Sequence, residues 1–168
     1  MLSFHNDATV KQKYVDRLVE HHRLDQIIQG TGYEEDSNRG CMVGCTLNNY
    51  HHKAYETELG LPEWYARLCD QIFEGLPKER APQFAMDGLT AIPVGVDITP
   101  VRWQLAILRH KRDLTKLESN TEPYAQQCRD AINQVIAYCE GELAGVQSES
   151  SAWSAARSAW SAARSAWS

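Results

Sequence analysis

The chain has 168 residues, of which 43% are hydrophobic and 23% are charged. These ordinary globular values exclude collagen-like, wholly disordered and membrane-embedded chains. The 17 Lys and Arg are outnumbered by 22 Asp and Glu, so a protein that coats nucleic acid is not expected. No stretch has the roughly 18 apolar residues of a membrane-spanning helix, and charges at Asp7, Lys11 and Lys13 do not fit a signal peptide. We therefore expect a cytoplasmic protein that does not bind membranes.

The first predicted element is a helix over residues 7–29. Apolar residues recur there every three or four positions, and Gly30 follows as a helix stop. Residues 30–39 are rich in turn formers and have no periodicity, which predicts a surface loop. This loop leads into the small, apolar segment 40–47, with the sequence GCMVGCTL.

Proline marks the starts of the later predicted helices, because its missing amide proton costs nothing in a first helical turn. These helices begin near Pro62, Pro100 and Pro123, and a shorter one follows Pro77 and ends by Gly88. No window has the sustained alternation of a strand. The sequence therefore predicts an all-α protein, with a compact helical bundle as one domain over residues 1–148.

Residues 149–168 are predicted to form a second element, a heptad-repeat helix. From Ser151 the sequence SAWSAAR occurs twice and is followed by SAWS. This period puts Trp153, Trp160 and Trp167 on one helical stripe, which would be an exposed apolar patch on an isolated helix. The stripe is expected to dock either on the protein's own bundle or on another subunit. In the second case these three Trp form the interface of a homo-oligomer.

Four segments of the chain resemble a family of uncharacterised bacterial and phage proteins. They are residues 21–25 (HHRLD), 39–47 (RGCMVGCTL), 59–64 (LGLPEW) and 91–95 (AIPVG). Proteins of this family also tend to end in Ser/Ala/Trp/Arg repeats, so the resemblance covers nearly the whole chain. Some relatives are labelled immunity proteins, which implies a role in conflict between bacteria and phages. The resemblance implies no particular activity or cofactor.

The loop that enters segment 40–47 has features of an anion-binding site. Backbone amides at a helix start attract negative charge, and Gly40 and Gly44 allow a ligand to approach closely. Arg39 adds a guanidinium group and Thr46 a hydroxyl group. The predicted site for a nucleotide-type anion consists of Tyr33, Arg39, Gly40, Cys41, Gly44, Cys45, Thr46, Trp64 and Trp103. The alternative is that the two glycines let this segment cross another element closely, with both cysteines in the core.

Cys41 and Cys45 are four residues apart, so both sulfurs lie on one face of a helix. With nearby histidines they could bind zinc, and a cysteine at a helix start could act as a nucleophile. The simpler hypothesis is that both are buried apolar residues. The chain has five Cys, and in the expected compartment these are reduced thiols.

Two His/carboxylate pairs are the candidate metal ligands. His22 with Asp25 and His52 with Glu56 have the spacing that places both members on one helix face. Helical bundles bind iron, manganese or zinc with such pairs. Because the Glu-x-x-His pairs of four-helix metal enzymes are missing, a solvated polar face is the favoured alternative, and no cofactor is expected.

The one basic stretch of the chain contains Arg102, Arg109, Lys111 and Arg112. It is predicted to be a solvated helix face or a contact with an anionic ligand or partner.

Together these patterns favour a non-catalytic binding protein that sequesters an anionic small molecule or blocks a host or phage protein. They offer anion donors and aromatic walls but no complete set of acid, base and nucleophile, so an enzyme is less favoured. Two alternatives stay open. One is a metal- or thiol-dependent enzyme built on His22, Asp25, Cys41, Cys45, His52 and Glu56, and the other is an oligomeric scaffold.

Overall fold

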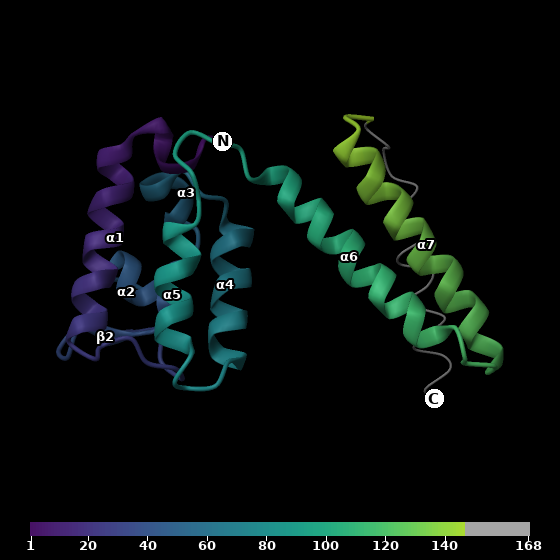
Figure 1. Cartoon of the computed structure of the whole chain (residues 1–168), viewed down its shortest axis with the longest axis horizontal. Coiled ribbons are helices and arrows are strands. Elements are labelled where there is room, and N and C mark those ends of the chain that lie inside the picture. Colours follow the sequence, from purple (N-terminus) through teal and green to yellow (C-terminus); the bar gives the residue numbers. More distant parts are fainter. Residues whose placement is uncertain (147–168) are drawn as a thin grey trace. The chain divides into compact units, whose positions relative to one another are not determined.

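The computed structural model describes residues 1–146, which fall into two compact units, residues 1–99 and the residues from Pro100 onward. The described part contains seven α-helices and one ribbon of two short strands (Figure 1), so the predicted all-α class is confirmed. Each unit has its own hydrophobic cluster. The boundary therefore lies within the range 1–148, for which the sequence predicts one domain. The predicted heptad helix lies outside the described residues.

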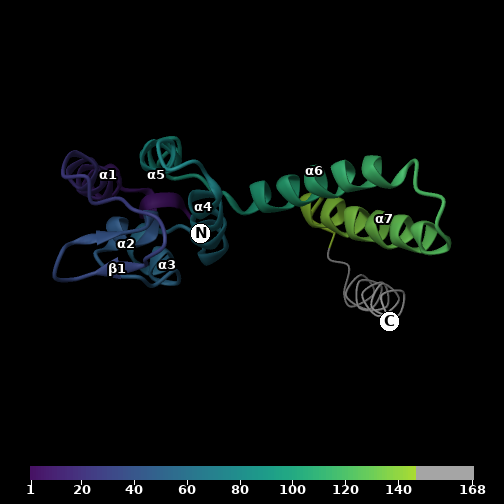
Figure 2. The same ribbon diagram turned by 90° about the horizontal axis from the view of Figure 1, so that it is seen from below.

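Five helices and a short 3₁₀ turn form the first unit. They are η1 (Ser3–Asn6), α1 (Ala8–Arg23), α2 (Met42–Leu47), α3 (Ala54–Leu59), α4 (Glu63–Gly75) and α5 (Ala81–Thr90). Helix α2 contacts α1 and α4, and α5 contacts both of these longer helices (Figures 1 and 2). The short helix α2 is therefore enclosed by its neighbours. None of the described helices is long and apolar enough to cross a membrane.

Helix α1 is shorter than the predicted helix over residues 7–29. Asp7 caps its start, since the carboxylate accepts a 2.7 Å hydrogen bond from the Thr9 amide. The chain leaves the helix after Arg23 and turns at Asp25, which has a left-handed φ of 53°. Ile27 then forms a parallel β-bridge with Gly40. This bridge replaces the last helical turns that the sequence periodicity predicts.

The predicted loop over residues 30–39 contains a small antiparallel ribbon. Strand β1 (Tyr33–Glu34) pairs with β2 (Arg39–Gly40), with Tyr33 opposite Gly40. The ribbon and the bridge at Ile27 meet at Gly40, directly before α2. They hold the entrance to α2 against the rest of the unit.

The N-terminal turn is tied to the end of the first unit. Phe4, His5 and Asn6 have left-handed φ angles of 53°, 53° and 60°, a conformation that costs about 1–2 kcal/mol per residue. Ser3 anchors this turn: its amide donates to the Val96 carbonyl oxygen (2.8 Å), and its hydroxyl donates to that of Pro93 (2.6 Å). The Phe4 side chain is fully buried. These contacts oppose the local backbone strain.

The second unit is described as a helical hairpin of α6 (Thr99–Leu117) and α7 (Pro123–Leu143). Ile107 of α6 and Ile136 and Cys139 of α7 are buried between the helices. The start of α7 agrees with the proline signal, and Glu122 is its N-cap residue. The helix ends in a Schellman-type turn at Gly145, whose φ is +71°.

Candidate functional site

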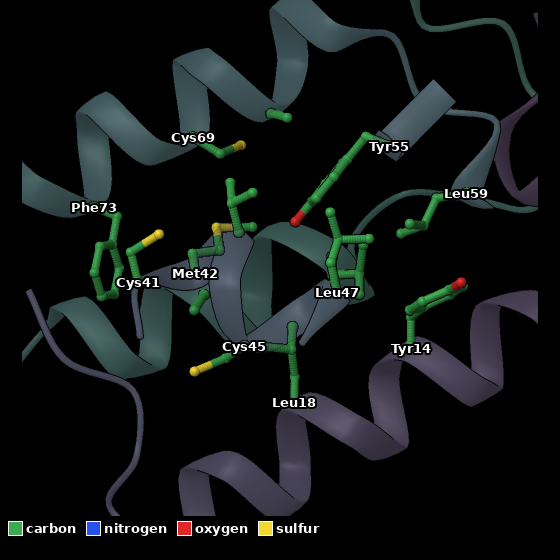
Figure 3. Close-up of a cluster of buried hydrophobic side chains, with 14 of the residues drawn as sticks. Tyr14, Leu18, Cys41, Met42, Cys45, Leu47, Tyr55, Leu59, Cys69 and Phe73 are labelled. Atoms are coloured by element: carbon green, nitrogen blue, oxygen red, sulfur yellow. The ribbon is translucent and has the colours of Figure 1, made fainter. Parts of the chain in front are cut away.

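The segment GCMVGCTL lies in the core of the first unit. Cys41, Cys45 and Thr46 are at most 1% exposed. Figure 3 shows side chains of α2 between residues of three other helices, among them Leu18 of α1 and Phe73 of α4. The segment therefore supplies packing for the first unit and offers no open surface to a ligand.

The two glycines of this segment allow backbone to pack against backbone. A Cβ atom at Gly44 would lie 1.9 Å from the carbonyl oxygen of Gly32, and one at Gly40 would lie 2.4 Å from the same atom. The Cys41 amide donates to the carbonyl oxygens of Thr31 and Gly32, both at 3.0 Å. The chain itself occupies the space beside the two glycines and binds the Cys41 amide, which argues against the predicted anion site. The structure agrees with the alternative prediction, in which the two glycines let this segment pack closely against another part of the chain.

The remaining residues of the predicted ligand site have other surroundings. Arg39 is exposed on the ribbon, and the Tyr33 ring packs edge-on against His21. Trp64 packs against Tyr65 of the first unit. Trp103 packs against Tyr138 of α7 in the second unit (centroids 5.7 Å apart). The aromatic residues that were expected to be pocket walls are therefore packing residues.

The buried thiols are held in their protonated form. Burial raises the pKa of Cys45 to about 12. Burial, followed by the neighbouring Asp70 carboxylate, also raises the pKa of Cys41. A cysteine must be a thiolate to attack a substrate or bind zinc, so this environment opposes both roles. Among residues 1–146, no group of three or more His, Cys, Asp or Glu side chains is arranged to hold a metal ion.

A buried carboxylate forms a polar cluster next to Cys41. Asp70 Oδ2 accepts a 2.9 Å hydrogen bond from the Tyr50 hydroxyl and lies 3.0 Å from Nε2 of His52. The side chains of Asp70 and His52 are only 11% and 12% exposed. Asp70 Oδ1 is buried and has no hydrogen-bond partner among the described residues. This cluster attaches the segment that joins α2 and α3 to helix α4. It also orients the His52 ring.

Sequence reasoning found His52 but missed Asp70 and Tyr50. The missed signal is that Asp70 lies in the apolar stripe of α4 together with Ala66 and Phe73. A buried acid in such a stripe needs a hydrogen-bonding or charged partner, because its desolvation is otherwise unfavourable. Glu56, the predicted partner of His52, instead accepts a 3.0 Å hydrogen bond from the Glu63 amide at the start of α4. His52 therefore pairs with Asp70 and not with Glu56, its predicted partner.

The other predicted metal pair lies on an open groove. His22 and Asp25 are both exposed and line a cavity of about 410 Å³ beside the start of α5. Lys78 and Glu79 line the same cavity. The groove thus carries charges of both signs.

Helix α6 has two apolar faces. Trp103, Ala106, Ile107 and Leu114 pack in the cluster with α7. Val101, Leu105 and Leu108 follow an i, i+4, i+7 pattern on the opposite side of the helix, because each residue turns about 100°. They are 41%, 43% and 65% exposed. We call these three residues, with Arg109 and Arg112 that continue the stripe, the outer face of α6.

The outer face is positively charged. Helix α6 contains five cations, Arg102, Arg109, Lys111, Arg112 and Lys116, and one acid, Asp113. Lys111 reaches Glu140 of α7 and Lys116 reaches Asp113. Within the described part of the chain, neither Arg109 nor Arg112 has a carboxylate at salt-bridge distance. Two residues of the basic stretch, Arg109 and Arg112, therefore continue an exposed apolar stripe.

No protein-family model, curated protein or solved structure matches this chain.

Proposed function

We propose that this chain is a non-catalytic binding protein that blocks a partner protein, and that the partner receives the outer face of α6 in an acidic, apolar-lined groove. The observation that carries this proposal is the second apolar stripe of α6, on the side opposite to α7. A surface helix needs only one such stripe to join its own domain. A second stripe, flanked by arginines that have no salt-bridge partner within residues 1–146, is typical of a helix that binds in a groove.

The two parts of the outer face have different tasks in this proposal. Leu105 and Leu108 supply apolar area, and burying such a side chain contributes about 1.5–3 kcal/mol. Arg109 and Arg112 provide charge that selects an acidic partner and speeds the encounter at low salt. The resemblance to a family with members labelled immunity proteins supports the further proposal that this blocking role belongs to conflict between bacteria and phages.

The other functions inferred from sequence have less support. Sequestration of an anion at segment 40–46 would need a surface that Gly32 already fills. A thiol-dependent enzyme would need a thiolate, whereas burial raises the pKa of Cys41 and Cys45. The proposal of partner binding uses only groups that are exposed.

Site-specific photocrosslinking in the native host, with and without phage, tests the proposal. p-Benzoylphenylalanine replaces Leu108 on the outer face or, as a matched control, Asn133, an exposed residue of α7. We expect one discrete heterologous adduct from position 108 that is absent from position 133. The partner is then purified, and its affinity for the chain should fall with added salt.

The double variant Arg109→Glu, Arg112→Glu should abolish the adduct from position 108 without changing the helix content of the chain, since both side chains are exposed. Equal adducts from positions 108 and 133, or none from either, contradict the proposal. An adduct only between two copies of this chain replaces partner blocking with the oligomeric scaffold.

A further inference from the structure

Two cavities lie between the segment that follows α1 and the start of α5. Their volumes are about 220 and 410 Å³, and both are lined by Ile27, Ile28, Lys78 and Pro82. The smaller cavity is otherwise lined by Gln29 and Ala81, so its lining is largely apolar with Lys78 as the charged residue. The larger cavity adds His22, Asp25, Glu79 and Gln83. Together they form a groove, named here the α1–α5 groove, with an apolar floor and a charged rim.

Ile27 lines both cavities, and its backbone has an unused pair of hydrogen-bonding groups. In its bridge with Gly40, the bonds run from the Gly40 amide to the Gln26 carbonyl oxygen (3.0 Å) and from the Ile28 amide to the Gly40 carbonyl oxygen (2.8 Å). The amide and carbonyl groups of Ile27 itself point to the other edge of the extended segment. Within residues 1–146, neither group has a hydrogen-bond partner in the chain.

This free edge is unusual because Ile27 is only 5% exposed. Buried backbone groups are nearly always paired, and an unpaired one costs free energy. The backbone therefore presents a donor and an acceptor, spaced as in a strand, beside a cavity that is large enough for a side chain. A bound segment with the same spacing would satisfy both groups.

We propose that the α1–α5 groove binds a short extended peptide, which pairs with Ile27 as an added β-strand. The recognition is of the β-augmentation type, in which main-chain hydrogen bonds give affinity and pockets select side chains. One apolar side chain of the peptide occupies the smaller cavity between Ile28 and Ala81. This site uses none of the residues of the α6 outer face, so it is independent of the function proposed above.

The charges of the rim define the flanking residues of the peptide. Lys78 lines both cavities, so an acidic peptide residue is expected beside it. Asp25 and Glu79 line only the larger cavity and favour a basic residue at the other end of the peptide. The groove therefore selects an apolar core between one acidic and one basic residue.

The test uses the full chain labelled with ¹⁵N and two probes, the peptide acetyl-Lys-Leu-Val-Leu-Glu-amide and its reversed sequence. We expect at least one of them to shift the Ile27 amide resonance and to slow its hydrogen exchange. A probe in which every internal amide is N-methylated should not bind, because it cannot pair with Ile27. Lys78→Glu should weaken binding about fivefold, the range of one exposed ion pair, and a probe with Lys in place of Glu should restore it.

Lys53→Glu is the matched control, since Lys53 is exposed on the same unit and lines neither cavity. The affinity of this variant for the probe should be unchanged. Two results overturn the proposal. One is the absence of any shift at Ile27 or Ile28 with both probes at millimolar concentration. The other is equal binding of the N-methylated probe, which would mean that the groove takes an apolar group without strand pairing.

Discussion

The substitution Gly44→Ala tests the central packing feature of the first unit. The added Cβ would lie 1.9 Å from the carbonyl oxygen of Gly32 and 2.9 Å from its carbonyl carbon. Both atoms are backbone, so they cannot move aside as the end of a flexible side chain can. Overpacking a core typically costs about 1–3 kcal/mol and more where backbone must shift. We therefore expect Gly44→Ala to lower the free energy of unfolding by about 3 kcal/mol or more, a large part of the roughly 5–15 kcal/mol of a typical domain.

Other glycines of the same unit provide a graded set of controls. Gly40→Ala should also destabilise the protein, because its Cβ would meet the same Gly32 oxygen at 2.4 Å. At Gly88, inside α5, the nearest atom is the flexible end of Met42 at 3.1 Å. At Gly75, the last residue of α4, no atom lies within 4 Å. Alanine at these last two positions should change stability by no more than about 1 kcal/mol, with the helix propensity of alanine as the favourable contribution.

The assay is urea unfolding of the full chain, followed by far-ultraviolet circular dichroism and by alkylation of Cys45. The alkylation reports the first unit alone, because Cys45 is fully buried there. Gly44→Ala should shift exposure of Cys45 to a clearly lower urea concentration than Gly75→Ala. Equal midpoints for these two variants would refute the close contact between α2 and residue 32, and with it the argument against the predicted anion site.

Two further predictions concern buried ionisable groups. Asp70→Asn should lower the free energy of unfolding by about 1–3 kcal/mol, because Tyr50 and His52 lose a charged partner. Urea unfolding measures this change. As the control, Asp87→Asn at an exposed site should have little effect on stability. Stability should also fall as pH rises between about 9 and 12, because the native state holds the Cys45 proton more tightly than the unfolded state does. Unfolding midpoints across this range should depend less on pH in Cys45→Ala, and an unchanged slope would contradict the assignment.

The helices that could be predicted are those with local signals. Pro62, Pro100 and Pro123 each lie within one residue of a helix start, because the preference of proline for the first turn depends on neighbouring residues alone. The end of α1 could not be predicted in this way, since the bridge of Ile27 to Gly40 is a tertiary contact that overrides helical periodicity. Gly88 was expected to stop α5 but lies inside it.

The candidate sites were predicted less well than the fold, for a related reason. Gly40 and Gly44 indicate close approach, but the sequence does not say whether a ligand or the chain itself approaches. The basic stretch with Arg109 and Arg112 was visible in the sequence. These arginines continue an apolar stripe that α7 leaves exposed. This could not be predicted without knowing which face of α6 is covered by α7.

The anchoring of Ser3 has a consequence for the order of folding during synthesis. Its partners Pro93 and Val96 are about ninety residues away in the sequence, so the N-terminal turn cannot be secured until residue 96 has left the ribosome. Until then Phe4, His5 and Asn6 lack the Ser3 anchor, although His5 can already reach the Thr57 carbonyl oxygen. The first unit should therefore close late and in one cooperative step, as expected for contacts of high sequence separation. A nascent chain stalled before Pro93 should remain open to proteases.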